Sequence, residues 1–206
     1  RYPLAPGDAV LTTDHVYAAC KNALEELCDR TGGQLIVARV PFPLQAPEQV
    51  TAAVEAALTP RVRLALIDHV TSPTGLVCPV EQLVPRLRAR GVEVLIDGAH
   101  APGMVHLDLT KLGAAYYTGN CHKWLCAPKG AGFLHVRRDR QEDLYPTVIS
   151  HGYNATRRDR PRLHLLFDWT GTGDPTPALC VPAALRSQDA EATVRTTHAG
   201  LVAAIT

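Results

Sequence analysis

The segments LALIDHV (residues 64–70) and VEVLIDGAH (residues 92–100) decide the fold. In both, apolar residues follow one another without the alternation that a strand with one solvent-facing side shows. Such runs are typical of parallel sheets, because helices cover both faces of those sheets. The two segments therefore predict buried strands of a mostly parallel sheet.

Apolar runs of strand length alternate with helix-like segments along most of the chain. The expected strands are Ala9–Thr13, Gln34–Val40, Val62–Val70, Val92–Ile96, Ala114–Thr118 and Gly132–Val136. The expected helices between them are His15–Thr31, which stops at Gly32, then Glu48–Leu58, and Val80–Arg90, which contains Pro85. This order predicts an α/β fold: a three-layer, mostly parallel sheet with helices on both faces.

The alternating pattern weakens after about residue 145. Residues 151–177 are rich in Arg, Asp, Gly and Pro, which predicts a long irregular connection of the kind that is often functional. Further helices are expected over Ala178–Arg186 and Ala190–Ala204.

Composition narrows the class of protein. The chain has 206 residues and a formal net charge of +1, which gives no electrostatic case for binding nucleic acid. Its 6 cysteines are scattered, so we expect reduced thiols and a cytoplasmic location. No apolar run is long enough for a membrane span, and the start, RYPLAPGDAV, resembles no signal peptide. The chain does not begin with Met, so Arg1 need not be the natural start.

Polar side chains follow the expected strands at the edge where parallel strands bind ligands. The strand at residue 62 leads to Ser72, the strand at residue 92 leads to Asp97 and His100, and the strand at residue 114 leads to Asn120, His122 and Lys123. Asp14 and His15 join the same rim if the first strand belongs to the same sheet.

An aspartate, a lysine and several hydroxyl or imidazole groups at one rim suit a pyridine-based cofactor. Such a cofactor needs a carboxylate to keep its ring nitrogen protonated and a lysine to form a Schiff base with its aldehyde. It also needs donors for its phosphate and phenolic oxygen. His122 and Trp124 flank Lys123 and give the lysine partly buried surroundings, which favour loss of its proton.

Three motifs carry a resemblance to a known family. HVTSPTG (69–75), DGAHAPG (97–103) and GNCHKWLCAPKGAGFL (119–134), in this order and spacing, resemble the class V aminotransferase family. That family binds pyridoxal 5′-phosphate (PLP) on the fold-type I scaffold. Within it the likeness is greatest to isopenicillin N epimerase-like proteins and weaker to cysteine desulfurases. It runs from about Gly7 to about Leu185.

The resemblance implies that Lys123 is catalytic. It would hold the cofactor as a Schiff base and then move the α-proton of an amino-acid substrate. Asp97 would pair with the pyridine nitrogen. His15, in TTDHVYAAC, matches a histidine that stacks on the cofactor ring.

The remaining implied residues bind other parts of the cofactor. Ser72 and His100 match positions near the phenolic oxygen, and Asn120 and His122 match the phosphate-binding turn. Thr172, in WTGTGDPTP, matches a residue that reaches the phosphate of a neighbouring subunit. The resemblance therefore implies a homodimer with shared sites.

Compared with the family, the chain is expected to be truncated at both ends. Residues 1–186 would be a partial PLP-binding large domain that lacks an N-terminal phosphate-binding turn. Residues 187–206 would begin an incomplete small domain, so no residue is assigned to the substrate carboxylate. The expected function is chemistry at the α-carbon of an amino acid, by epimerisation, transamination or lyase action. The alternative is a catalytically silent fragment or dimerisation partner.

Plainer interpretations compete at the central residues. Lys123 alone could be a surface lysine, and Asp97 could form an Asp-Gly turn. His15 could be an early helix residue with Asp14 as the cap.

The other candidates also have plain interpretations. His100 and His106 could be ordinary histidines, which we favour for His106. Cys121 and Cys126 lack the spacing of a zinc site, so no metal is expected, and Cys121 is interpreted as packing rather than as a reactive thiol. The cluster 157–160 (RRDR) is interpreted as a solvated loop, with binding of an anionic substrate or partner as the alternative.

Overall fold

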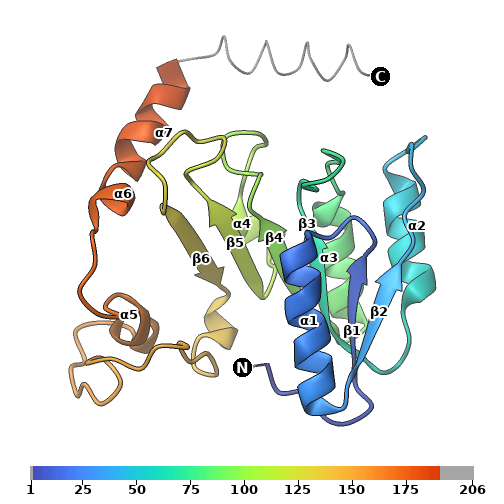
Figure 1. Cartoon of the computed structure of the whole chain (residues 1–206), viewed down its shortest axis with the longest axis horizontal. Helices are drawn as coiled ribbons and strands as arrows, with labels where there is room; N and C mark the ends of the chain where they lie inside the picture. The colour runs from blue at the N-terminus through green and yellow to red at the C-terminus, as the bar shows by residue number, and fades with distance from the viewer. Residues whose placement is uncertain (1, 191–206) are drawn as a thin grey trace.

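The computed structural model describes residues 2–190. Its centre is a 6-stranded sheet with the strand order β2-β1-β3-β4-β5-β6 (Figure 1). Neighbours from β2 to β5 pair in parallel, and β6 pairs antiparallel with β5. The predicted mostly parallel sheet is confirmed. The strands are β1 (Ala9–Thr13), β2 (Gln34–Ala38), β3 (Val62–Asp68), β4 (Glu93–Gly98), β5 (Tyr116–Asn120) and β6 (Gly132–Val136).

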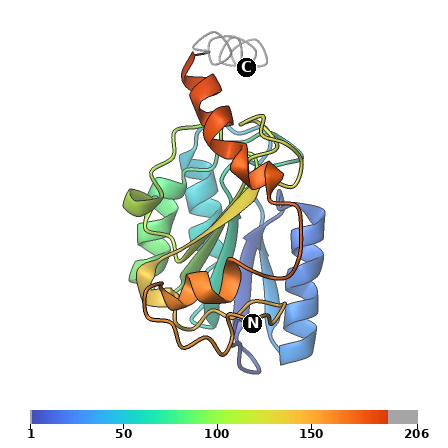
Figure 2. The same cartoon turned by 90° about the vertical axis from the view of Figure 1, so that its left-hand side faces the viewer.

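Helices cover both faces of the sheet, as predicted. Helix α1 (Ala18–Thr31) packs on one face, and α2 (Glu48–Ala57), α3 (Val80–Ala89) and the short α4 (Leu109–Leu112) lie on the other. Figure 2 shows the sheet between these two layers. The three layers follow from strands that are apolar on both sides, since each face must be removed from water.

The central strands β1 and β3 contribute side chains to two hydrophobic clusters, one on each face of the sheet. On the α1 side, Val10 and Leu64 pack with Leu24 of the helix. On the opposite side, Ile67 packs in a larger cluster with Leu83 of α3. Burying each Leu or Ile side chain stabilises the fold by roughly 1.5–3 kcal/mol. The larger cluster therefore fixes the strands whose ends carry the candidate site.

Helix α1 begins three residues later than expected, at Ala18 rather than His15. The turn after β1 is tied to the chain beyond β2: Asp14 N–H donates to the carbonyl of Ala38 (3.0 Å), and Asp14 Oδ1 accepts from Val40 N–H (2.9 Å). These bonds hold residues 14–16 out of the helix. The interpretation of Asp14 as a helix cap is therefore wrong, and so is that of His15 as an early helix residue.

The chain after β6 carries more regular structure than expected. A 3-10 turn (Arg138–Arg140) is followed by α5 (Arg162–Phe167), α6 (Thr176–Leu179) and α7 (Val181–Ala190), at the β6 end of the molecule in Figure 1. The region expected to be irregular thus contains α5, and the helix expected over Ala178–Arg186 is two helices. Helix α7 crosses the domain boundary expected after residue 186. The helix expected over Ala190–Ala204 lies outside the described residues.

Helix α7 reaches back to the loop that carries the lysine motif. Its Val181 and Ala184 pack against a small cluster that includes Cys121 and Leu125. Cys121 is buried there, which agrees with its interpretation as packing, and burial raises the pKa of its thiol. Within residues 2–190, no helix is both long enough and apolar enough to cross a membrane.

Candidate active site

A cavity of about 260 Å³ lies where β3, β4 and β5 end and α1 begins. Its position agrees with the rule that parallel sheets bind ligands at the carboxyl ends of their strands. The predicted residues Ser72, Asp97, His100, Asn120 and Lys123 all line it, together with Tyr17, Cys20, Asp68, Ala99 and Thr118.

Lys123 lies in the turn after β5, where its amine faces an imidazole. Lys123 Nζ is 3.1 Å from Nε2 of His100, and Nδ1 of the same ring accepts the indole N–H of Trp124 at 3.0 Å. Burial lowers the pKa of His100; the positive charge of Lys123 lowers it further, and Asp97 opposes both. The imidazole is therefore neutral at neutral pH, and Lys123 is not a plain surface lysine.

Asp97 is the penultimate residue of β4, and it lines the same cavity. Its Oδ1 accepts the N–H of Ala99 (2.9 Å), and its Oδ2 accepts the thiol of Cys20 (3.3 Å). Burial, and then the charge of Asp97, raise the pKa of Cys20 to about 12, so this thiol stays protonated and donates. The hydrogen bond from Ala99 is the one expected of an Asp-Gly turn. Asp97 is nevertheless part of the sheet, where its register partner is Thr118 of β5.

A second carboxyl group stands beside Asp97. Asp68, the last residue of β3, is the register partner of Asp97 and is only 3% exposed. Burial, and then the charge of Asp97, raise the pKa of Asp68 from 3.8 to about 7, against the opposing effect of hydrogen bonds from the backbone amides of Asp68 and Tyr17. Its Oδ2 has no hydrogen-bond partner among the described residues. Asp68 is therefore only partly ionised near neutral pH.

Three predicted site residues do not line the cavity. His15 is buried in the turn after β1, where its Nδ1 is 2.8 Å from Thr74 Oγ1 and its Nε2 is 3.3 Å from the carbonyl of Val40. His122 donates from Nδ1 to the carbonyl of Ala131 (2.8 Å). Thr172 lies in the exposed connection between α5 and α6.

Several lining residues were missed in the sequence analysis. Asp68 had a signal, because the runs LALID and VEVLID carry the same Ile-Asp pair at or next to the ends of β3 and β4. Tyr17 and Cys20 are three residues apart, which places them on one side of the start of α1. Their approach to the cavity depends on where that helix begins, and the sequence pattern misplaced its start.

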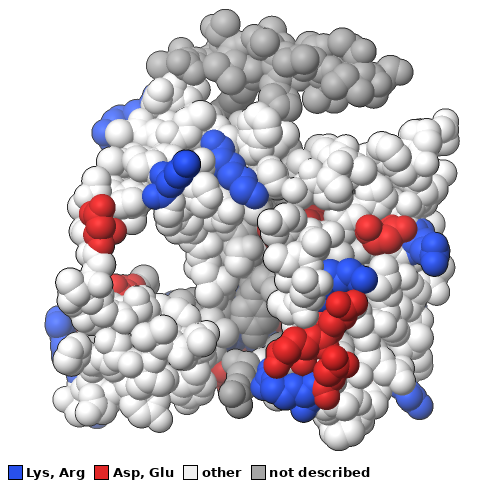
Figure 3. All heavy atoms as spheres, viewed as in Figure 1, with Lys and Arg blue, Asp and Glu red and all other residues white. Residues whose placement is uncertain are grey.

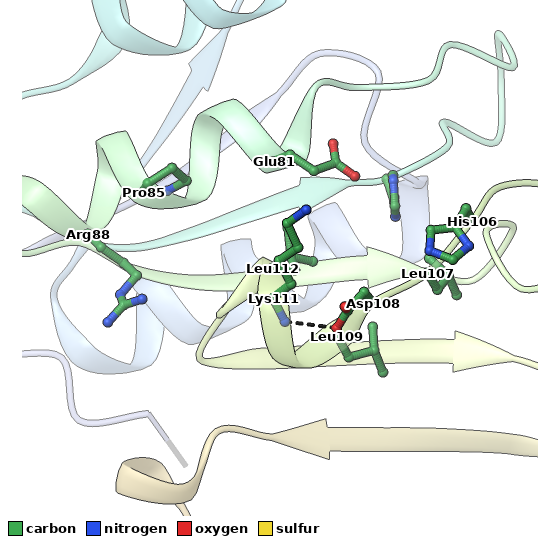
Figure 4. Close-up of a pocket in the computed structure, with 10 residues that line it drawn as sticks. Glu81, Pro85, Arg88, His106, Leu107, Asp108, Leu109, Lys111 and Leu112 are labelled. Carbon is green, nitrogen blue, oxygen red and sulfur yellow. Dashed lines mark hydrogen bonds between the residues drawn. The ribbon is translucent and has the colours of Figure 1, made fainter.

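A second cavity, of about 340 Å³, lies on the opposite face between α3 and α4. Figure 4 shows Glu81 on α3, Lys111 on α4 and His106 around it. Buried His69 also lines it, with Nδ1 2.8 Å from the hydroxyl of Tyr117. This cavity contains none of the predicted cofactor residues, and His106 belongs to it rather than to the candidate site.

Several surface charges form ion pairs. On the face in Figure 3, acidic and basic side chains lie close together over α1, where Lys21 bonds Glu25 at 3.1 Å and Arg30 bonds Glu26 at 3.2 Å. Arg157 pairs with Asp159, as a solvated loop would. Among residues 2–190, no group of three or more His, Cys, Asp and Glu side chains is arranged to hold a metal ion.

Comparison with known proteins places this geometry in context. Residues 1–159 match the family described as aminotransferase class-V. The chain is 40% identical over 195 residues to isopenicillin N epimerase of Streptomyces clavuligerus, covering 89% of this chain and 48% of that one. It is 33% identical to L-cysteine desulfhydrase of Arabidopsis thaliana, covering 86% and 40%. It thus spans about half the length of the epimerase.

Solved structures show the same architecture. A cystine C-S lyase, C-DES, in complex with its product cysteine persulfide superposes with a TM-score of 0.78 at 25% identity, covering 92% of this chain and 51% of that one. A second C-DES structure, with glycine covalently linked to its PLP cofactor, gives a TM-score of 0.76 at 25% identity, covering 91% and 50%. Because the family match extends over most of its length, the chain belongs to the class V aminotransferase family.

Proposed function

We propose that this chain forms the PLP-binding part of an enzyme that acts at the α-carbon of an amino acid. The observation that carries the proposal is one cavity that contains the amine of Lys123, the neutral imidazole of His100 and the carboxylate of Asp97. Solved relatives at this level of similarity include one with a PLP cofactor.

The donor set fits PLP. Asp97 Oδ2 accepts only a thiol, a weak donor, so it keeps the capacity to accept a stronger bond from a protonated ring nitrogen. The buried Oδ2 of Asp68 has no partner beside it. Ser72 and Asn120 place a hydroxyl and an amide on the same wall, where they can donate to anionic oxygens.

Each residue then has a distinct task. When bound, PLP supplies an electron sink for the α-carbon of an amino acid. Lys123 holds the cofactor covalently and moves the proton of the α-carbon. Asp97 would keep the ring nitrogen of a bound PLP protonated, and His100 would face its phenolic oxygen. Of the cavity residues, only Lys123 combines a nucleophilic amine with reach into the centre of the site.

Three further roles follow from the family rather than from the cavity. We propose that His15 borders the cofactor ring from the turn after β1 and that His122 supports the phosphate-binding turn. We also propose that Thr172 acts in a homodimer, where it serves the site of the second subunit. In a single chain Thr172 lies outside the cavity, which is what a residue shared across subunits requires.

The relatives narrow the reaction. Epimerisation of an amino acid and removal of sulfide from cysteine both require loss of the α-proton, and relatives of this chain carry each of these names. We therefore propose α-proton abstraction as the first chemical step. The bond broken afterwards depends on the substrate.

Exchange of the α-proton in D₂O tests the proposal. The PLP-loaded chain is incubated with a panel of amino acids that includes cysteine, and the α-proton signal is followed by NMR. The signal of at least one amino acid is expected to decay. The decay should be lost in Lys123→Arg and kept in Lys129→Arg, an exposed lysine of the same loop. PLP uptake without exchange of any amino acid would instead favour the catalytically silent alternative.

A further inference from the structure

Three polar groups form a row at the wall of the cavity. The indole N–H of Trp124 bonds Nδ1 of His100 at 3.0 Å, and Nε2 of His100 lies 3.1 Å from the amine of Lys123. Trp124 and Lys123 are neighbours in the chain, so one short turn contacts both ring nitrogens of His100.

The row has only one consistent arrangement of protons. An indole nitrogen donates and cannot accept, so Nδ1 of His100 must present a lone pair. A neutral imidazole then carries its proton on Nε2. Nε2 therefore presents its N–H to Lys123 Nζ, and an amine accepts a hydrogen bond only when it is uncharged, so this tautomer favours the uncharged form of Lys123.

The surroundings keep the ring neutral. Burial lowers the pKa of His100, and a positive charge at Lys123 would lower it further. Asp97 acts in the opposite direction but is the smallest of the three influences. The imidazole therefore has one proton to place, and Trp124 decides which nitrogen carries it.

The backbone of Trp124 is held independently of its side chain. Its carbonyl accepts the side-chain amide of Gln188 in α7 at 2.7 Å. A Cβ added to Gly103 would lie only 2.4 Å from the same carbonyl oxygen, so the backbone at Gly103 passes close to this turn. A bond from α7 and the close approach of the loop after β4 thus hold the backbone of this turn, and the bond to His100 holds the indole.

We propose that Trp124 is a positioning residue for Lys123. Its indole N–H fixes His100 as the Nε2–H tautomer, and this tautomer directs an N–H at Lys123 Nζ, which favours the uncharged amine over the ammonium by about one hydrogen bond. The inference rests on the proposed function, because a neutral amine is the form that condenses with an aldehyde. It concerns residues of this chain alone, so it is measured without cofactor.

Nitrogen NMR of the cofactor-free protein tests the first half. With ¹⁵N-histidine labelling, the signals of His100 are assigned by their loss in His100→Gln. The Nε2–H tautomer is expected in the wild type, and Trp124→Phe should shift the tautomer ratio toward Nδ1–H by roughly two- to tenfold, the effect of one ordinary hydrogen bond. Trp169→Phe is the matched control, since Trp169 is 50% exposed in the late loop. An unchanged ratio in Trp124→Phe would overturn the proposal.

Trace acetylation tests the second half, because only neutral amines react. Cofactor-free protein is treated with a trace of acetic anhydride near neutral pH, and each lysine is quantified by mass spectrometry. Lys123 should react faster than the ion-paired Lys21, and Trp124→Phe should slow it roughly two- to tenfold. Equal rates in the wild type and Trp124→Phe would contradict the proposal. Circular dichroism confirms that each variant is folded.

The two proposals fail separately. If the tautomer and the labelling rate depend on Trp124 but the chain never takes up PLP, the proposed function is wrong and the positioning role stands. If PLP attaches to Lys123 but neither the His100 tautomer ratio nor the Lys123 acetylation rate changes in Trp124→Phe, the positioning role is wrong.

Discussion

The stability of Asp68→Asn relative to the wild type should increase as the pH rises. Asp68 is buried beside Asp97, and its pKa is raised from 3.8 to about 7. The folded protein therefore binds a proton that the unfolded chain has released. The contribution of Asp68 to wild-type stability is fully present below its pKa in the unfolded chain. It is lost as the pH rises through its pKa in the folded protein.

The size of the effect follows from the shift. A change of about 3 pKa units corresponds to about 4 kcal/mol, and about 3 kcal/mol of this falls between pH values of about 5 and 8. Asn cannot ionise, so Asp68→Asn lacks this slope. The difference in unfolding free energy between variant and wild type should rise by about 3 kcal/mol over the same interval. Comparing two pH values cancels any constant effect of the substitution.

Urea unfolding of the cofactor-free protein at these two pH values is the assay. Asp29→Asn is the control, because Asp29 is exposed on α1. Its difference from the wild type should stay nearly constant with pH. A pH-independent difference for Asp68→Asn would refute the reasoning, since it would show that Asp68 is ionised in the folded state.

Three further substitutions test the surroundings of the site. Gly103→Ala places a Cβ 2.4 Å from the carbonyl of Trp124 at a φ of +88°; it should cost roughly 1–3 kcal/mol in urea unfolding and slow PLP attachment. Tyr117→Phe removes the hydroxyl that bonds buried His69 at 2.8 Å, and thermal unfolding should show a loss of about 1–3 kcal/mol; no loss would mean that the bond contributes nothing. Asp97→Asn should weaken PLP retention about tenfold or more in dialysis, as removal of a charged acceptor does, and unchanged retention would contradict its pairing with the ring nitrogen.

Much of the fold follows from local patterns. Strands such as Val62–Asp68 are apolar on both sides, so their number and their positions along the chain are readable from the sequence. The boundaries that failed depend on distant contacts: the bond from Asp14 Oδ1 to Val40 N–H delays α1, and no periodicity within residues 14–31 encodes it. Helix α5 was missed because it is short and has only Leu166 buried.

The candidate site was predictable to the extent that strand ends define it. Lys123 and Asp97 follow strands directly, so the rule for parallel sheets brings them together. Asp68 was missed although its strand ends in the same way. Trp124 was treated as a flanking apolar residue, and its bond to His100 depends on how two loops approach each other.

Peptide mapping after borohydride reduction tests the central claim most directly. The chain is incubated with PLP, reduced and digested, and the mass of the peptide that contains residues 119–130 is measured. The peptide should gain one reduced cofactor at Lys123, and the gain should disappear in Lys123→Arg but persist in Lys129→Arg. Attachment spread evenly over exposed lysines, or none at Lys123, would contradict the assignment of this cavity as a PLP site.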